Sequence, residues 1–392
     1  MNWARKIGRR EMVARLAKGL GAAAAASLLV RWSFRRSYRR LQERIEQFQA
    51  DRKSVAPLPG LLDLKGVIHV HSLLSHDSKG TPEEIVRSAH EAGLRFLITT
   101  DHNNKRIFTE GIQGRFDDLW VIRGAEFVKK GQALLAIDIQ DYIDGRGMAV
   151  RQVVREIKSQ GGLAFVAHPL GFRDWDIEGI DGMEIYNISD SARAQAWKAP
   201  WLVLELLSSW DDYPGEAFLS LLSRPGHHLS QWDKALQTKR LVGIAGNNAH
   251  KNLKVFGRQL DPYPLTFKYV QTHLLAAALE KRALLDALKA GHAYLSFGLL
   301  ADATGFQFFA RRDGLVGIMG DEMPYSPGLV LTVQTPQSTV IQLFRNGQVV
   351  EEAASTRLDH LVKEKGTYRV EAFLEIRGDR YPWIFSNPIY VV

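Results

Sequence analysis

Histidine and carboxylate side chains recur at the ends of short apolar runs in this 392-residue sequence. The positions are His69, His71, Asp77, Asp101, His102, Glu126, His168 and His250. Imidazole nitrogens and carboxylate oxygens bind divalent metal ions, and a bound ion makes water acidic enough to supply hydroxide near neutral pH. The residue types therefore predict a metal-dependent hydrolase that needs no side-chain nucleophile.

Each of these side chains also has a structural explanation when it is taken alone. A histidine at the end of a strand is more often hydrogen-bonded within the protein than bound to a metal. Asp77 would serve in a turn, and Glu126 would pair with Arg123 at the surface. Their joint occurrence favours one site, because the carboxyl ends of parallel barrel strands meet at one mouth. The His-x-His spacing of His69 and His71 also puts two rings on one face of a strand.

The segments that must position these residues alternate between short apolar runs and helical patterns from residue 66 to residue 296. The apolar runs cover residues 66–71, 95–100, 119–122, 133–137, 163–167, 182–186 and 241–245. Thr81, Pro82 and Glu84 begin one helix, because they combine a capping residue, a first-turn proline and a capping box. Uninterrupted apolar strands between helices predict a parallel sheet that is buried on both faces and closes into an α/β barrel over residues 60–300.

The pattern changes after Leu300. Asn346-Gly347 separates two strand-like runs, and this pair is typical of a tight hairpin because both residues accept positive φ. Residues 366–372 alternate between apolar and polar side chains, as a half-buried strand does. We therefore expect residues 301–392 to form a β-sandwich that supplies no catalytic group.

Composition excludes several classes of function. The sequence has no cysteine, which excludes disulfide bonds, thiolate nucleophiles and metal sites with cysteine ligands. The net charge of +8 is uneven, because residues 1–53 hold 14 of the 51 basic residues and only 4 of the 43 acidic ones. The remaining body is close to neutral, and we therefore expect no nucleic-acid partner.

The basic N-terminal segment, residues 1–55, is predicted to associate with a membrane or to act as a signal segment. Arg9-Arg10 precedes the apolar stretch from Gly19 to Val30, which is too short to span a bilayer as a helix. Basic residues around it suit an anionic lipid surface. We expect the protein at the bacterial inner membrane, with the periplasmic side favoured by the arginine pair. A basic amphipathic helix without membrane contact is the alternative.

The sequence resembles the PHP (polymerase and histidinol phosphatase) superfamily of metallohydrolases. The matching segments are His69-Val70-His71-Ser72, Ser75-His76-Asp77, Thr100-Asp101-His102-Asn103, Gly124-Ala125-Glu126, Ala167-His168-Pro169 and Gly246-Asn247-Asn248-Ala249-His250. Residues 284–291 and the β-rich C-terminal part look like the branch named for carbaryl hydrolase (CehA/McbA-like). The resemblance implies the fold class α/β, a distorted (β/α)7 PHP barrel with a C-terminal β-sandwich. It also implies up to three divalent ions, which would be Zn, Mn, Fe or Mg.

Carried onto this sequence, the resemblance implies three sets of ligands. The first set is His69, His71, Glu126 and Asn248, the second is Asp77, His102 and His250, and the third is Glu126, His168 and Gln132. Asn248 and Gln132 stand where the family pattern has Asp and His, so two of the three sites are expected to be weakened.

Catalytic roles are assigned to Asp101, Glu126 and His168, with Asp101 orienting a ligand histidine. Lys251 and Arg106 are candidates for binding a substrate anion. The predicted function is a phosphoesterase that uses metal-activated hydroxide on a small phosphorylated molecule. The alternatives are a hydrolase of carboxylic or carbamate esters or amides, and an impaired barrel that only binds a ligand.

Overall fold

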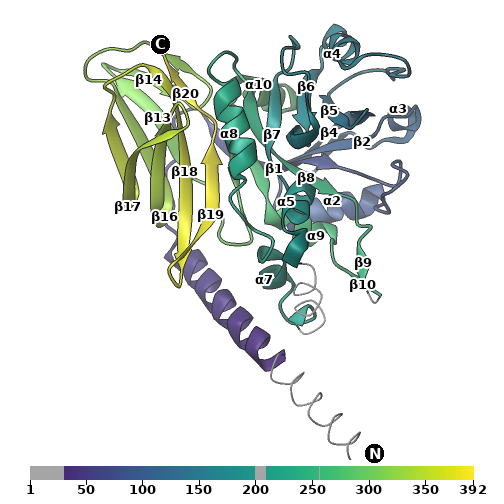
Figure 1. Ribbon diagram of the computed structural model, residues 1–392, viewed down its shortest axis with the longest axis horizontal. Helices are drawn as coiled ribbons and strands as arrows, with labels where there is room; N and C mark the ends of the chain where they lie inside the picture. The colour runs from purple at the N-terminus through teal and green to yellow at the C-terminus, as the bar shows by residue number, and fades with distance from the viewer. Residues whose placement is uncertain (1–30, 199–208, 256) are drawn as a thin grey trace, which may run out of the picture.

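The computed structural model describes residues 31–198, 209–255 and 257–392. A barrel surrounded by helices lies beside a C-terminal part built from long strands, which is yellow-green in Figure 1. A helix over residues 31–51, purple in Figure 1, lies below the strands of the C-terminal part. The two bodies share one continuous set of paired strands, so the C-terminal part is built directly onto the barrel.

Within the described residues, seven strands close the barrel. They are β1 (Leu62–Val70), β2 (Phe96–His102), β4 (Leu119–Lys129), β5 (Gln132–Ile137), β6 (Leu163–Ala167), β7 (Gly182–Asn187) and β8 (Val242–Ala249). Neighbouring strands are parallel from β6 through β7, β8, β1 and β2 to β4, and the β1–β8 pairing closes the ring. Nearly every residue of β2, β6 and β7 is buried, as strands covered on both faces must be.

The prediction of an all-parallel sheet is wrong at β5, because this strand runs antiparallel to both β4 and β6. Lys130 and Gly131 join β4 to β5 in a two-residue turn, and both have positive φ. So short a connection forces the chain to reverse, whereas a parallel neighbour needs a long crossover. The barrel is therefore distorted, and the predicted fold class, a distorted (β/α)7 barrel with a C-terminal β-sandwich, is confirmed.

Amphipathic helices cover the barrel. They are α2 (Pro82–Glu91), α3 (Arg106–Glu110), α4 (Val150–Ser159), α5 (Ile188–Ala194), α7 (Pro214–Leu219), α8 (Gly226–Ala235), α9 (Tyr263–Tyr269) and α10 (Lys281–Ala290), with 3-10 turns η1 (Pro169–Gly171) and η2 (Ala196–Lys198). The predicted start of α2 is confirmed, because the Thr81 side chain accepts from the Glu84 N–H and Pro82 opens the helix. α4 buries Val150, Val154 and Ile157 at helical spacing.

The C-terminal strands continue the barrel sheet outwards. β11 (Gln271–Ala276) pairs with the first half of β1, β12 (Ala293–Ser296) pairs with β11, and β19 (Asp379–Ser386) pairs with β12. The other strands are β13 (Gln307–Arg312), β14 (Leu315–Ile318), β15 (Glu322–Met323), β16 (Val330–Arg345), β17 (Gln348–Leu361), β18 (Gly366–Ile376) and β20 (Ile389–Val391). The predicted hairpin at Asn346-Gly347 joins β16 to β17, and both residues have positive φ. The short strands β3 (Gly114–Phe116), β9 (Lys254–Val255) and β10 (Arg258–Gln259) lie in loops.

A buried ion cluster joins the sandwich to the segment before β8. Arg369 of β18 is 1% exposed, and its guanidinium donates to both oxygens of Asp233 on α8 at 2.6 and 2.7 Å. It also donates to Glu371 at 2.7 Å, and Glu371 accepts two further bonds of 2.6 Å from Arg224. A buried charge without its partner is very unfavourable, so these contacts hold α8 and the preceding loop in a fixed position against β18.

The described part of the N-terminal segment packs on the body through Tyr38, Ile45 and Phe48, which are buried. Arg9-Arg10 and the apolar stretch from Gly19 to Val30 lie outside the described residues. Among the described residues, no helix has the length and apolar character needed to cross a membrane. The predicted domain boundaries at residues 55, 60 and 300 stay predictions.

Candidate metal centre

The predicted histidines lie at one mouth of the barrel, and the backbone is irregular where β1 delivers the first two. The pairing register of β1 shifts between Ile68 and Val70 on both sides, and His69 has a φ of 70°. This bulge, and not simple alternation along the strand, sets the directions of the rings. The ring centres of His69 and His71 lie 5.1 Å apart.

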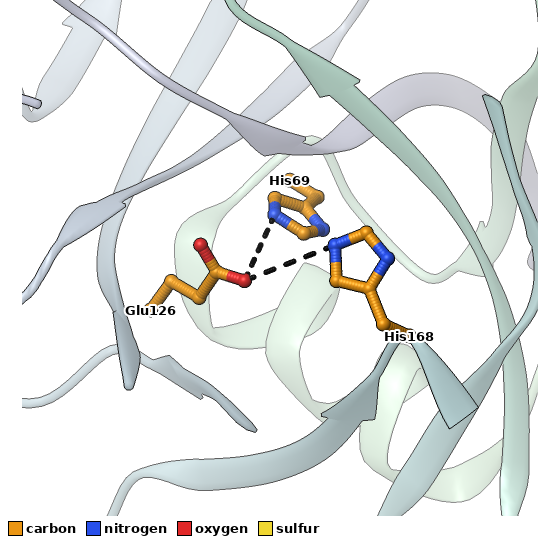
Figure 2. Close-up of side chains that lie close together, drawn as sticks. All are labelled: His69, Glu126 and His168. Carbon is orange, nitrogen blue, oxygen red and sulfur yellow. Dashed lines mark ion pairs between the residues drawn. The ribbon is translucent and has the colours of Figure 1, made fainter. Parts of the chain in front are cut away.

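Glu126, at the end of β4, lies between four histidine rings and is 3% exposed. Its Oε1 atom is 3.6 Å from His69 Nε2 and 4.0 Å from His168 Nε2, as Figure 2 shows. Its Oε2 atom is 3.6 Å from His71 Nε2 and 3.0 Å from His102 Nδ1. One carboxylate therefore presents one oxygen to each of two pairs of histidines.

Asp77 completes the second half of the cluster. Its Oδ2 atom is 3.3 Å from His102 Nε2, and its Oδ1 atom is 3.4 Å from His250 Nδ1. The ring of His250 stacks on His71 with centres 3.9 Å apart. The turn after β1 and the ends of β2 and β8 thus bring Asp77, His102 and His250 together.

Asn248 joins the two halves from the end of β8, where its φ is 47°. Its Oδ1 atom lies 2.8 Å from His250 Nε2, and its Nδ2 atom lies 3.4 Å from His168 Nε2. Its Nδ2 group also donates to Ser189 Oγ at 2.9 Å. Asn248 therefore lies within the cluster, as expected, and contributes no charge.

Gln132 does not join the cluster, which corrects the ligand set that the family resemblance implied. Its Oε1 atom accepts from the N–H groups of Arg173 and Asp174 at 2.8 and 3.3 Å, and its Nε2 atom donates to the Asp174 carboxylate at 3.1 Å. Gln132 opens β5 opposite Lys129, at the tip of the β4–β5 hairpin and beyond Glu126. The Gln132 side chain therefore holds the loop at Arg173 and Asp174 and is not placed to bind a metal ion of the cluster.

Among the residues that the structure describes, two groups of three have ligand atoms close enough to hold one ion each. They are His69 with Glu126 and His168, and His71 with Asp77 and His102, and within each group the atoms lie within 4.8 Å of one another. The resemblance implied a different division, in which His69 and His71 shared an ion. In the structure each of these two histidines belongs to a separate group.

Two carboxylates that sequence reasoning missed hold the first group in place. Glu184, fully buried on β7, accepts from His69 Nδ1 at 2.5 Å and from the His168 N–H at 2.9 Å. Asp190 of α5 accepts from His168 Nδ1 at 2.8 Å. Gly246 leaves the space for Glu184, because a Cβ there would come within 1.9 Å of Glu184 Oε1. A charged residue inside the apolar run 182–186 was the available signal for Glu184.

Asp101 reaches the ligand histidine His71 through Ser75, so the orienting role predicted for it is that of a positioning residue. It accepts from Ser72 N–H, Ser72 Oγ and Ser75 Oγ at 2.6, 2.8 and 2.6 Å. The Ser75 oxygen lies 3.0 Å from His71 Nδ1. Because the Ser75 hydrogen points to Asp101, its oxygen accepts from the Nδ1–H group of His71. This leaves His71 Nε2 as an unprotonated donor atom for a metal.

The charges of the cluster influence one another strongly. Burial opposes charge on His69, but the carboxylates of Glu184 and Glu126 outweigh it and raise the pKa of His69 to about 10. Burial, together with the positive charge of nearby His69, holds the pKa of His71 well below its usual value. Burial also lowers the pKa of His250 to about 4. A metal ion would replace a proton on His69 and would meet unprotonated nitrogens on the other two rings.

Several atoms of the cluster are suited to bind a metal ion because they have no hydrogen-bond partner among the described residues. His69 Nε2, His71 Nε2, His250 Nδ1 and Asp77 Oδ1 are buried and have no hydrogen-bond partner in the described chain. A buried polar atom normally has a partner, and a lone imidazole nitrogen that faces carboxylate oxygens suits a divalent cation. The donor set therefore fits Zn²⁺, Mn²⁺ or a similar ion.

The two cations expected to bind a substrate anion are engaged elsewhere. Lys251 forms an ion pair with Glu84 of α2, and Arg106 binds Glu110 one turn further along α3 through two hydrogen bonds. Each charge is neutralised by its own carboxylate. The sequence-based assignment of these two residues is not supported by the structure.

Comparisons with known proteins give one matching family, one curated relative and similar solved structures. The sequence pattern of the PHP domain family matches residues 68–303 of this chain. The uncharacterised protein MJ1587 of Methanocaldococcus jannaschii is 27% identical over 143 residues, which are 32% of this chain and 82% of that protein. A two-domain protein of Bacteroides vulgatus ATCC 8482, which contains a predicted PHP-like metal-dependent phosphoesterase, is 15% identical with a TM-score of 0.46 and covers 86% of this chain and 98% of its own.

We predict that Glu184→Gln weakens metal binding by roughly 10- to 100-fold, because the uncharged amide makes His69 a less basic ligand. The change keeps the size of the side chain, so the barrel should still fold. Affinity for Mn²⁺ or Zn²⁺ would be measured by competition with a chromophoric chelator. Asp181→Asn is a matched control, because Asp181 pairs with Lys158 and not with a histidine of the cluster. Equal affinities for Glu184→Gln and the control would show that Glu184 does not support a ligand.

Proposed function

The chain belongs to the PHP domain family, and from this premise we propose that it is a metal-dependent phosphoesterase acting on small phosphorylated molecules. The observation that carries the proposal is the position of Glu126, whose two oxygens each face a different pair of histidines. We infer two cation positions, one at His69, Glu126 and His168 and the other at His71, Asp77 and His102. Glu126 would contribute to both.

The protein's own groups provide the rest of the chemistry. Divalent cations, when bound, polarise a phosphoryl oxygen and acidify water to near neutral pKa. Glu184, Asp190 and Ser75 each hold one ring nitrogen, so the opposite nitrogens of His69, His168 and His71 stay directed at the shared space. This arrangement costs no reorganisation when substrate binds, which is how preorganised polar sites accelerate reactions.

Asn248 lowers the repulsion that the site exerts on an anionic substrate. Asn248 is uncharged where the family resemblance expects an aspartate, so the cluster carries one negative charge fewer. A phosphate group brought to this mouth therefore meets less repulsion from the ligands. The resemblance to the CehA/McbA-like branch would instead suit a carboxylic or carbamate ester, which carries no charge at the reacting group.

We predict that the protein loaded with Mn²⁺ or Zn²⁺ hydrolyses p-nitrophenyl phosphate, and that Glu126→Gln lowers kcat/KM by about a hundredfold or more because both cation positions lose a charged ligand. Glu156→Gln, an exposed change on α4, is the control and should leave the rate unchanged. Turnover of p-nitrophenyl acetate or a carbamate without phosphatase turnover would contradict the proposal and favour the carbaryl-hydrolase branch. Metal binding without any turnover would favour a binding protein.

For the N-terminal segment we propose contact with the anionic surface of the bacterial inner membrane, with the body on the periplasmic side. What supports this is the excess of basic residues in residues 1–53 and the exposure of Arg36, Arg39 and Arg40 beside Trp32, which is 59% exposed. Tyr38, Ile45 and Phe48 pack on the body, so a truncation should stop before the helix over residues 31–51 and not at residue 55.

We predict that the full chain co-floats with vesicles containing phosphatidylglycerol at low salt and that removal of residues 1–30 together with charge reversal at Arg36, Arg39 and Arg40 abolishes this. Salt should weaken binding, because the attraction between exposed charges is screened. Vesicles of phosphatidylcholine alone are the control. A full chain that stays unbound at low salt would contradict the proposal.

A further inference from the structure

A cavity of about 230 Å³ lies at the end of the barrel opposite to the metal centre. Its wall includes Asp63 from the start of β1 and Leu275 from the end of β11, whereas His69 lies near the other end of β1. Asp63 and His69 are six positions apart on this strand, which corresponds to roughly 20 Å at about 3.3 Å per residue. A small molecule bound in the cavity therefore lies well away from both inferred cation positions.

The wall of the cavity is largely apolar. Three segments form it, namely the linker between the helix over residues 31–51 and β1, the paired ends of β1 and β11, and the segment that leads into β13. Its apolar side chains are Val55, Leu58, Leu61, Leu62, Leu275 and Phe306. Phe306 and Leu275 are buried, and Leu62 is 44% exposed. Such a wall favours a hydrocarbon chain, because apolar surface that leaves water stabilises the complex.

Arg52 is a residue of this wall whose hydrogen bonds are incomplete. A guanidinium is always protonated and offers five N–H donors. Arg52 Nη2 donates to the Thr304 carbonyl oxygen at 2.7 Å, but the Nε atom of this half-buried side chain is buried without a partner. Among the described residues, Arg52 forms no ion pair with a carboxylate. A charge without a counter-ion and a buried donor without an acceptor both indicate an anionic ligand.

Asp63 lies in the same wall but does not pair with Arg52. Its Oδ1 atom lies 2.8 Å from His273 Nδ1. Its Oδ2 atom accepts from the Tyr294 hydroxyl at 2.6 Å and from the Gly305 N–H at 2.7 Å. The Asp63 charge still opposes further negative charge nearby, so a monoanion suits the cavity better than a dianionic phosphate ester. A carboxylate is such a monoanion, and its oxygens accept strong hydrogen bonds from a guanidinium.

The linker that forms one side of the cavity is held in place. The Gln307 side chain donates to the Ala56 carbonyl oxygen at 2.5 Å. Gly305 has a φ of 99°, and a Cβ added there would lie 3.2 Å from the Val55 side chain, so glycine permits this close approach. The linker is thus fixed against the segment before β13, and binding would cost little additional ordering of the chain.

We propose that this cavity binds a small amphipathic carboxylate, with the carboxylate on Arg52 and the hydrocarbon chain against Leu58, Leu61 and Phe306. The Nε–H group of Arg52 would donate to a carboxylate oxygen. A neutral amphiphile would leave the guanidinium without a counter-ion, and an amine would be repelled by it. The site needs neither a metal ion nor a phosphate group, so it is independent of the proposed phosphoesterase function.

The binding test compares octanoate with 1-octanol, which has the same chain length without the charge. Both are titrated calorimetrically into the full chain loaded with Mn²⁺, with excess inorganic phosphate present to compete for the cation positions. Arg52→Gln should weaken octanoate binding roughly tenfold, because a charge-assisted hydrogen bond is lost, and should change octanol binding by less than about twofold. Arg87→Gln, an exposed change on α2, is the matched control and should bind both ligands as the unmodified chain does. No octanoate binding, or equal octanoate affinities for Arg52→Gln and the control, would overturn the proposal.

A second pair of variants tests the site without changing Arg52. Leu62 is exposed, so it can be replaced without disturbing the core. Leu62→Glu places a further negative charge in the wall and should weaken octanoate binding several-fold more than Leu62→Gln does, while both variants bind octanol equally. Equal octanoate affinities for these two variants would contradict the proposed site. Octanoate binding without any phosphatase turnover would support this inference and overturn the phosphoesterase proposal alone.

Discussion

The metal centre depends on holding four of its five histidine rings, those of His69, His168, His71 and His250, by one ring nitrogen, while both nitrogens of His102 face Glu126 and Asp77. Glu184 holds His69, Asp190 holds His168, Ser75 holds His71, and Asn248 accepts from His250. Each of these contacts orients its ring, so the opposite nitrogen faces the cluster, where a metal ion would displace a proton from His69 and would meet an unprotonated nitrogen on His71. Without them the rings would turn to satisfy one another or the Glu126 and Asp77 carboxylates, and no common ligand geometry would remain.

The backbone is strained at the same places. His69, His168 and Asn248 all have φ between 47° and 70°, a region that residues other than glycine rarely adopt. Each lies at or next to the end of a barrel strand, where the chain turns away and the side chain points inwards. The closed barrel and its buried core must supply the stability that keeps these conformations in place.

The sequence allowed metal-site residues to be predicted where their position at the end of a strand decides their function. His69, His102, Glu126 and His250 could be assigned because polar residues after apolar runs meet at a barrel mouth, and the structure brings them together. Glu184 was missed because it lies inside the apolar run of β7. The prediction considered only polar residues at the ends of such runs.

Other features needed three-dimensional information. The direction of β5 was predicted wrongly because an apolar run carries no direction, and because the predicted runs 119–122 and 133–137 left ten residues between them, where the structure has a two-residue turn. Gln132 was misplaced because the alignment with the family could not show that a hairpin tip carries it away from Glu126. Asp190 was missed because its hydrogen bond with His168 joins residues 22 positions apart, and no local sequence pattern predicts such a contact.

The central claim is that one carboxylate, Glu126, joins two cation positions at this mouth. The most direct measurement is anomalous diffraction from crystals soaked in Mn²⁺. The account predicts two peaks, one against His69, Glu126 and His168 and one against His71, Asp77 and His102, both of which weaken in crystals of Glu126→Gln. Peaks located elsewhere, or two peaks that keep full strength without the Glu126 carboxylate, would contradict it.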